Sequence, residues 1–382
     1  MIRSRAARGL MLLLTPVWAS VRAQDDAARI AEPTAWSDHE VGAGVRLRQR
    51  AFARLFAGPQ FVSVLEIQRA PATRFDLVAP GERRWTSSMG QQAGALAAIN
   101  GGFFAIESTG LSIGLLRLDG QPVVPAKEGQ GSVGLTRAGE LQLATRAAGD
   151  WPEMHDALGA GPMLLVDGVV QDHGARQRAI RHPRTAVGVL ADGSVLWVVV
   201  DGRAKEAVGM SFEETAAVLA ALGCRDGLNL DGGGSSTLWL AGRGVCNHPC
   251  DDKRFDAAGE RRVANALLLF APAVVVADDR DAERRGDGWQ SRDGVSSSTM
   301  AGARAVFRAE LPFAGRYRVR VLGPSAAPVR VELYGGAARE CVLPAEFGEA
   351  TFPAGLPAFV TVAATTGGVA VDAVRFEQIV GR

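Results

Sequence analysis

Short apolar or alternating runs, separated by glycine-rich and Asp-Gly turns, recur along the first three quarters of the chain. They include QFVSVLEIQ (60–68), TAVGVLADG (185–193), SVLWVVVDG (194–202) and VANALLLF (263–270). Runs of this length, rich in β-branched residues and bounded by turn residues, are typical of β-strands. The ADGS turn at 191–194 joins two of these runs as a hairpin, which predicts a largely antiparallel sheet.

One helix is predicted in this region, over Phe212–Leu222. Ser211 precedes it as the N-cap, and Glu213 and Glu214 occupy the first turn, where carboxylates suit the positive end of the helix dipole. Because strands are many and helices few, we expect an α+β domain built on strand-rich mixed or antiparallel sheets.

The pattern changes near residue 275. A charged stretch, DDRDAERRGDGW (278–289), is followed by alternating segments such as FRAELPFAGRYRVRVLG (307–323) and VAVDAVRFEQI (369–379). Short strands with regular turns favour a smaller all-β sandwich. Because 382 residues exceed the usual size of a single core, we expect two domains, over residues 24–275 and 277–382.

The first 23 residues have the pattern of a signal peptide. Arg3, Arg5 and Arg8 precede the short apolar run LMLLLTPVW (10–18), and the small residues of a cleavage site follow at 21–23. We therefore expect export to the periplasm or the exterior, with no membrane span after the signal is removed. The chain has 42 basic and 41 acidic residues, so its charge gives no reason to expect nucleic acid as a partner.

The cysteines leave two questions open. Cys246 and Cys250 are close enough in sequence for a small disulfide loop, which export permits. His248 between them suggests zinc, but a tetrahedral site needs four ligands and only three lie nearby, so we predict no zinc site.

The most informative segment is the glycine-rich run NLDGGGSST, Asn229–Thr237. Apolar residues precede and follow it, so it is predicted as strand, tight loop and strand. It lacks the lysine and the following helix of a P-loop. Glycines let a ligand approach backbone N–H groups, which favours a binding site. The alternative is an elaborate hairpin turn, since Asp-Gly is itself a turn signal.

Three further polar clusters stand at the ends of predicted strands. Asn100, Gly101 and Gly102 follow one strand, Arg184 and Thr185 begin another, and Asp201 and Arg203 follow the next. Loops on a rigid sheet commonly carry function, so we expect these clusters to meet the glycine-rich run in one pocket.

These motifs together carry a family resemblance. AAINGGFF (97–104), GAGPMLLVDG (159–168), RHPRTAVGVLADGSVLWVVVDGR (181–203), VGMSFEET (208–215) and LGCRDGLNLDGGGSSTLWL (222–240), in this order, resemble the phosphodiester glycosidase family over residues 40–272. The resemblance implies a hydrolase that removes a sugar, N-acetylglucosamine among the candidates, from a phosphodiester. This chain departs from the family in that Ala105, not an acid, follows NGGFF.

The residues present suit such a reaction. A phosphate leaving group departs readily and needs charge stabilisation more than protonation. Arg184 offers a bidentate fork for phosphate oxygens, and the amides of Gly232, Gly233 and Gly234 add donors. Asp231, favoured because glycines allow close approach, and Asp201 are the candidate nucleophile or base. The predicted contacts to sugar or phosphate are Asn100, Gly101, Gly102, Thr185, Arg203, Asn229 and Ser235.

No cofactor is predicted, because arginine already neutralises the phosphate. Calcium or magnesium stays open, since the acids and amides offer hard oxygen ligands. The expected substrate is a sugar-phosphate diester or phosphoglycan of a bacterial cell envelope or exopolysaccharide. The alternative is a glycan-binding or envelope-assembly protein that holds such a polymer without cutting it.

The C-terminal region resembles the golvesin-like sandwich module of bacterial extracellular enzymes. The resemblance is carried by DGW before a serine run, by LPFAGRYRVRV (311–321) and by VAVDAVRF (369–376). It implies a domain that docks the enzyme to cell-wall or polysaccharide material.

Overall fold

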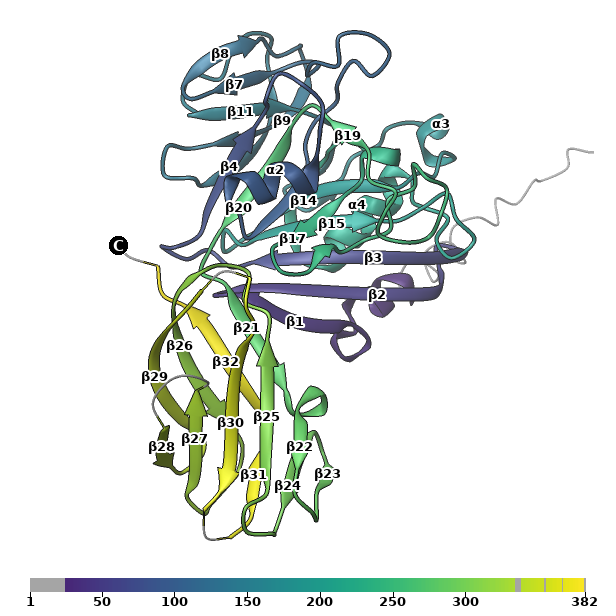
Figure 1. Cartoon of the computed structure of the whole chain (residues 1–382). Coiled ribbons are helices and arrows are strands. Elements are labelled where there is room, and N and C mark those ends of the chain that lie inside the picture. Colours follow the sequence, from purple (N-terminus) through teal and green to yellow (C-terminus); the bar gives the residue numbers. More distant parts are fainter. Residues whose placement is uncertain (1–24, 334–337, 354, 366, 381–382) are drawn as a thin grey trace, which may run out of the picture.

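The computed structural model describes residues 25–333, 338–353, 355–365 and 367–380. The predicted signal peptide lies outside these residues. Figure 1 shows a larger domain with several sheets and, below it, an elongated sandwich of strands. Among the described residues, none of the helices has the length and apolar character that a membrane crossing requires.

An eight-stranded antiparallel sheet forms the base of the larger domain. Its strands follow the order β1-β2-β3-β15-β14-β16-β12-β13. Their bounds are β1 Ser37–Gly42, β2 Val45–Leu55, β3 Gly58–Ile67, β15 Val195–Val200, β14 Arg184–Leu190, β16 Cys224–Asn229, β12 Met163–Val166 and β13 Val169–Val170. The predicted hairpin is confirmed, because β14 and β15 pair in antiparallel register from Arg184 opposite Val200 to Val189 opposite Val195.

Two five-stranded sheets and a short strand pair complete this domain. The first sheet has the order β10-β9-β11-β7-β8 and the second β18-β17-β6-β20-β4. The bounds are β10 Leu141–Arg146, β9 Gln130–Leu135, β11 Asp156–Gly159, β7 Leu116–Leu118, β8 Gln121–Val124, β18 Gly244–Val245, β17 Leu238–Leu240, β6 Ala97–Asn100, β20 Ala266–Phe270 and β4 Arg74–Val78, with β19 Arg262–Val263 paired to β5 Arg84–Trp85. The prediction of a strand-rich domain is confirmed.

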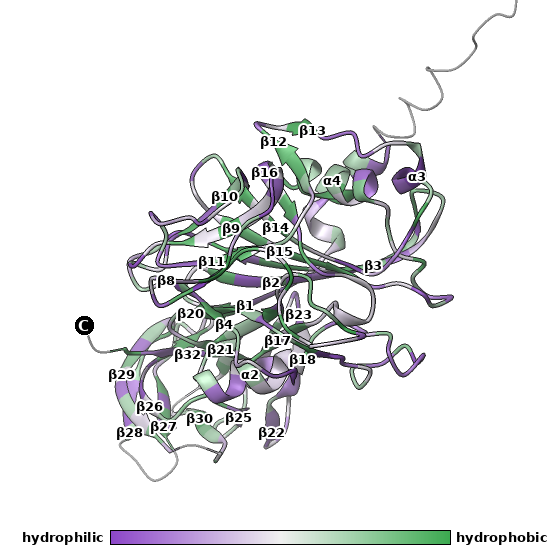
Figure 2. Ribbon diagram, turned by 90° about the horizontal axis from the view of Figure 1, so that it is seen from above, coloured by the Kyte–Doolittle hydropathy of each residue, from purple (hydrophilic) through white to green (hydrophobic). Residues whose placement is uncertain are grey.

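The main hydrophobic core lies between these sheets. One face of the eight-stranded sheet supplies alternate residues such as Val187 and Trp197, and the five-stranded sheets supply Ile99, Val133 and Leu267. Each of these side chains is at most 1% exposed. Figure 2 shows that β14 and β15 in this layer are mainly hydrophobic. Burial on both faces explains why their sequences are apolar almost throughout.

Helix α4, Phe212–Ala221, covers the opposite face of the eight-stranded sheet. Ser211 caps it, and the Ser211 and Glu214 side chains form a reciprocal capping box, so the predicted helix is confirmed with its end one residue earlier. Apolar residues such as Leu219 pack on Ala186 and Val198 of the sheet. The other helices are α2 Thr86–Ala93, α3 Ala175–Arg178, the helical residues 25–31, and the 3₁₀ turns η1 Pro33–Ala35, η2 Gly233–Ser235 and η3 Asp279–Asp281.

The glycine-rich run crosses from one sheet to another. It leaves β16 at Asn229, passes through η2 and enters β17 at Leu238. Strand, loop and strand are therefore as predicted. The hairpin alternative is wrong, because β16 belongs to the eight-stranded sheet and β17 pairs with β6 in a different sheet.

The smaller domain is a β-sandwich. Its main sheets have the orders β21-β32-β26-β29 and β22-β25-β30-β27-β28, and a third sheet has the order β23-β24-β31. The bounds are β21 Val274–Asp278, β32 Ala373–Gln378, β26 Gly315–Leu322, β29 Ala345–Phe352, β22 Glu283–Arg285, β25 Arg304–Ala309, β30 Ala358–Ala364, β27 Val329–Leu333, β28 Ala338–Cys341, β23 Gln290–Arg292, β24 Val295–Ser298 and β31 Val369–Val371. Phe307, Tyr317 and Phe376 fill its core and are fully buried.

The two domains meet directly at the start of the sandwich. Strand β20 ends at Phe270 and β21 begins at Val274, so the predicted boundary at 275–277 falls inside the first sandwich strand. Both Nη atoms of Arg375 donate to the Glu40 carboxylate at 2.8 Å, which ties β32 to β1 across the junction.

Candidate functional site

The candidate site is built on the glycine loop, defined here as Asp231–Ser235. Gly233 has a φ of 64°, in the left-handed region where a side chain is strained, and its N–H donates to the Pro183 carbonyl at 2.9 Å. Gly234 is closely packed for a different reason. A Cβ at Gly234 would collide with the Asp251 carboxylate and the Arg261 guanidinium. The loop backbone is thus pressed against charged side chains.

Asn100 holds the loop from below. Its Nδ2 donates to the Asp231 carbonyl at 2.7 Å, and its Oδ1 accepts from the Thr185 hydroxyl at 2.7 Å and the Thr237 N–H at 3.1 Å. The residue is completely buried. The predicted role of Asn100 in binding substrate therefore does not fit, because its amide is fully used in fastening the loop to β14 and β17.

The Asp231 carboxyl stands at the start of the loop. Its Oδ1 accepts the Gly232 N–H at 2.9 Å. Burial raises the pKa of this carboxyl above its ordinary value, although the Ser235 hydroxyl, the Gly232 N–H and the positive charge of Arg261 favour the ionised form. A carboxyl with a raised pKa beside charged groups is a candidate for proton transfer at a functional site.

Two arginines flank the glycine loop. The Arg203 guanidinium lies so close that a Cβ on Gly233 would be 3.0 Å from its Nη2. Arg203 also contacts His182 Nδ1 at 3.4 Å and Cys250 Sγ at 3.8 Å. Arg261 binds the Asp251 carboxylate with two hydrogen bonds, of 2.7 and 2.6 Å, and attracts the Asp231 carboxylate. Two guanidinium groups thus lie at the loop: the exposed one of Arg203, and that of Arg261, which is paired with Asp251.

Asp201 lies beside the loop in a buried pair with His248. The Asp201 carboxylate accepts from His248 Nδ1 at 2.7 Å, from the His248 N–H at 3.1 Å and from Asn247 Nδ2 at 2.9 Å. Burial raises the pKa of Asp201, which is 1% exposed, and these hydrogen bonds oppose the rise. A carboxylate only accepts, so His248 Nδ1 carries the hydrogen and Nε2 is left to exchange a proton.

The imidazole of His248 is held in place on two sides. It stacks on Phe255 with ring centres 3.9 Å apart and meets the edge of Phe61 at 4.7 Å. Its side chain is 25% exposed, whereas Asp201 is closed off. Asn247 links the pair to the residue that follows the glycine loop, since its Nδ2 also donates to the Ser236 carbonyl at 3.0 Å. Asp201 therefore acts on a ligand only through His248.

Arg184 lies close enough to Arg203 for that charge to act on it, but its own hydrogen bonds go to backbone carbonyls away from the loop. Its Nε donates to the Met210 carbonyl at 2.8 Å, its Nη2 donates to the Ile180 carbonyl at 3.1 Å, and its guanidinium lies 4.2 Å from the Phe212 ring centre. Burial lowers its pKa to about 10. Neighbouring residues on a strand face opposite sides, so Arg184 points to helix α4 while Thr185 points to Asn100. These contacts hold the Arg184 guanidinium on the helix side of β14, so they do not support its predicted phosphate contact, which stays a prediction.

The other predicted binding residues form the buried support of the loop. Asn229 donates to the Gly161 carbonyl at 3.0 Å and is 1% exposed. Gly101 accepts the Asp231 N–H at 2.9 Å. Thr185 is also buried, and a Cβ on Gly102 would collide with the Gly159 carbonyl. These buried residues join the segments around Gly101, Thr185 and Asn229, so they hold the glycine loop in place and do not face a substrate.

The glycine N–H groups differ from the prediction too. Gly232 donates to the Asp231 carboxylate and Gly233 to the Pro183 carbonyl. Two of the three predicted phosphate donors are therefore already engaged. The charged groups that meet at the loop are instead Asp231, Arg203, Arg261 and Asp251.

Sequence reasoning missed Asp251, Arg261 and the Asp201–His248 pair. His248 was considered only as a zinc ligand beside Cys246 and Cys250, which are free thiols in the structure. One signal was available, because the polar segment of residues 247–261 follows the glycine loop after only a short strand pair. The partners of these residues lie 10 or more positions away, so no local pattern announces them.

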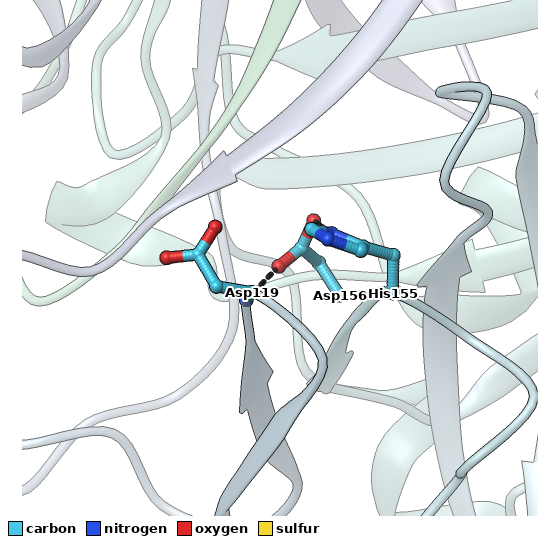
Figure 3. Close-up of side chains that lie close together, drawn as sticks. All are labelled: Asp119, His155 and Asp156. Carbon is cyan, nitrogen blue, oxygen red and sulfur yellow. Dashed lines mark hydrogen bonds and ion pairs between the residues drawn. The ribbon is translucent and has the colours of Figure 1, made fainter.

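Within the described residues, one group of acid and histidine side chains has ligand atoms close enough for a metal ion: Asp119, His155 and Asp156. Figure 3 shows these side chains at the turn after β7 and the start of β11. His155 Nδ1 and Asp156 Oδ2 are 2.9 Å apart, and the Asp119 N–H donates to Asp156 Oδ1 at 2.7 Å. These contacts stabilise a turn, and none of the three residues belongs to the glycine loop.

A cavity in the larger domain does not include the glycine loop. Its volume is about 640 Å³, and it is lined by the ends of β3, β10 and β15, including Arg69, Phe75 and Glu140. None of the charged residues around the loop lines it. We therefore base the candidate site on the convergence of charged side chains at the loop.

Comparison with known proteins identifies relatives of this region. A family model described as phosphodiester glycosidase matches residues 93–270. N-acetylglucosamine-1-phosphodiester alpha-N-acetylglucosaminidase from Bos taurus is 27% identical over 278 residues, which cover 64% of this chain and 52% of that protein. The SPbeta prophage-derived uncharacterized protein YomE of Bacillus subtilis is 34% identical over 103 residues, which cover 27% of this chain and 14% of that protein.

A solved structure is also similar. The zebrafish N-acetylglucosamine-1-phosphodiester alpha-N-acetylglucosaminidase catalytic domain, auto-inhibited by its pro-peptide, aligns with a TM-score of 0.47 and 18% identity. The alignment covers 62% of this chain and 83% of that chain. The chain thus spans about half the length of the bovine relative, and the matched family region contains the whole glycine loop.

Proposed function

Because residues 93–270 match the phosphodiester glycosidase family model, we propose that the protein hydrolyses the bond between a sugar and a phosphodiester. The observation that carries the proposal is the glycine loop itself. It brings the Asp231 carboxyl, whose pKa is raised, next to the Arg203 and Arg261 guanidinium groups. A carboxyl and two cations suit a reaction in which a sugar separates from phosphate.

In the proposed reaction the arginines stabilise the departing phosphate. The bond between the anomeric carbon and the phosphate oxygen breaks, and its electron pair leaves with the phosphate. Arg203 is exposed, and Arg261 is held rigidly by Asp251. Fixed positive groups at the place where charge develops lower the barrier without reorganisation. They replace Arg184 as the phosphate ligands.

Asp231 and His248 have separate roles in this proposal. Asp231 serves the anomeric carbon as nucleophile or base, since it stands at the loop and is only partly buried. His248 Nε2 moves the proton between water and the leaving phosphate, with Asp201 holding the ring in the tautomer that has hydrogen on Nδ1. Water supplies the hydroxyl that ends on the sugar.

Export, the sugar and the natural substrate belong to the same proposal. The basic and apolar residues at the start of the sequence support export. A bovine relative named for N-acetylglucosamine-1-phosphodiester supports that sugar as the first to test. In an exported protein, an envelope or extracellular phosphoglycan would be the substrate, and the golvesin-like sandwich would dock the enzyme to polysaccharide.

The test is turnover by the purified chain from residue 24 onward. N-acetylglucosamine and other sugars in UDP or aryl phosphodiesters are offered, and released sugar is quantified by chromatography. We expect turnover of at least one compound, and an Asp231→Asn variant should lose about 10²- to 10⁴-fold in kcat. Asp192→Asn is the matched control, because Asp192 also precedes a glycine and accepts a backbone N–H, but in an exposed hairpin.

The binding-only alternative predicts a different pattern. A folded protein that binds a phosphoglycan, releases no sugar from any compound and binds equally well as Asp231→Asn would be a carbohydrate-binding protein. That outcome would end the enzymatic proposal.

A further inference from the structure

A buried acid whose carboxyl accepts no hydrogen bond from any described donor lies at the first corner of the sandwich, where β21 ends. Asp279 opens the 3₁₀ turn η3, directly after β21. It is 1% exposed, yet neither oxygen of its carboxyl accepts a hydrogen bond from any described residue. An ionised carboxyl taken out of water without a partner is strongly unfavourable, so something further must compensate Asp279.

The surroundings of Asp279 are acidic. The carboxyl of Asp278 interacts directly with that of Asp279, and Asp372, at the junction of β31 and β32, is close enough for both charges to act on it. The backbone fixes this arrangement, because the Asp279 N–H donates to the Asp372 carbonyl at 2.8 Å. Burial, together with the charges of Asp279 and Asp278, raises the pKa of Asp372.

The nearby arginines do not neutralise Asp279. Arg280 Nε and Nη2 both donate to the Asp278 carboxylate at 2.8 Å, and its side chain is 77% exposed. Arg284 Nη2 donates at 3.2 Å to the Asp279 backbone carbonyl, not to its carboxyl. Arg280 therefore neutralises Asp278 on the exposed side of the corner, and neither arginine hydrogen-bonds to the Asp279 carboxyl.

We propose that Asp279 and Asp278 bind a divalent cation of the calcium class at this corner, with Asp372 adding negative charge at longer range. Carboxylate and carbonyl oxygens are hard ligands, and Ca²⁺ accepts six to eight of them in flexible geometry. Water supplies the remaining ligands. The ion would lie at the end of β21, beside the point where the Asp279 N–H donates to the Asp372 carbonyl of the β31–β32 junction.

The competing explanation is a proton shared between the Asp278 and Asp279 carboxyls. A shared proton removes one negative charge, as in other close carboxyl pairs, and needs no ion. The two explanations differ in how they respond to calcium. They also differ in what happens when Asp279 loses its charge.

The experiment uses the mature chain freed of metal with a chelator and then titrated with CaCl₂ or MgCl₂. Binding is followed by calorimetry and stability by thermal unfolding. At saturating calcium we expect the unfolding temperature of the sandwich to rise by roughly 10 °C, with a smaller response to magnesium. Asp279→Asn should abolish the calcium response, and Asp281→Asn, an exposed acid in the same turn, should retain it.

The difference in stability between Asp279→Asn and the wild type should change sign when calcium is added. Without metal, Asp279→Asn should be more stable than the wild type, because the uncompensated charge is gone. With calcium it should be less stable. If the folded wild type binds no calcium, or if Asp279→Asn responds to calcium as the wild type does, the site is not a cation site and the shared proton is the better explanation.

Discussion

The role of Asn100 in supporting the glycine loop can be tested by removing its side chain. Asn100→Ala deletes three hydrogen bonds, to the Asp231 carbonyl, the Thr185 hydroxyl and the Thr237 N–H. Asn100 is completely buried, so water cannot replace its side chain as the partner of these three groups. An unsatisfied buried group costs about 1–3 kcal/mol, so the variant should lose about 4 kcal/mol of unfolding free energy.

The magnitude translates into an observable shift. For a domain of this size, 1 kcal/mol lowers the unfolding temperature by roughly 2–4 °C, so Asn100→Ala should unfold roughly 10 °C earlier. Thr185→Val is the matched control, because it removes only one of the three hydrogen bonds and keeps the shape of the side chain. Thr185→Val should lose about 1 kcal/mol.

Calorimetry gives the unfolding temperatures, and sugar release below the transition gives kcat and KM. We expect kcat to fall in Asn100→Ala because the Asp231 backbone loses its anchor, while KM changes little. An Asn100→Ala protein with the stability of the wild type and a strongly raised KM would refute the reasoning, since that result is what a direct substrate ligand would produce.

Three further predictions follow from the same contacts. Arg184→Lys keeps the charge but loses the planar guanidinium and its stacking on Phe212. Calorimetry should therefore show a loss of about 1–3 kcal/mol in the free energy of unfolding, with KM unchanged. A raised KM at unchanged stability would support the predicted phosphate contact instead. Gly234→Ala places a Cβ against the Asp251–Arg261 pair, so these side chains must shift away from the loop. We expect kcat to fall about 10²-fold while the circular dichroism spectrum stays that of the folded protein. An unchanged kcat would show that the close packing at Gly234 is dispensable. The pKa of the Asp231 carboxyl is raised in the folded protein, so wild-type stability falls as the pH rises from the ordinary pKa of 3.8 through the folded pKa. Asp231→Asn should therefore be more stable than the wild type at neutral pH and lose this advantage in acid. Denaturant unfolding across this pH range measures both stabilities, and a constant difference between the two proteins would contradict the assignment.

Much of the fold follows from local patterns in the sequence. The capping box at Ser211 needs only residues three positions apart, and the hairpin of β14 and β15 needs only a turn and two apolar runs. The glycine loop was equally visible as three consecutive glycines between two apolar runs, and the structure then gave Gly233 a φ of 64°. Local interactions of this kind are encoded by neighbouring residues, so a sequence displays them directly.

The direction of each functional side chain was decided only by the tertiary structure. Arg184 and Thr185 are adjacent in sequence, yet strand β14 turns one toward helix α4 and the other toward Asn100, because both of its faces are covered. His248 reaches Asp201 across 47 positions, and Arg261 reaches the glycine loop only after the chain has passed through β17 and β18. The sequence by itself determined the strands, the capped helix and the glycine loop between two strands. The packing of three sheets around a shared core determined which polar residues support that loop and which remain available for chemistry, since burial depends on contacts between distant segments.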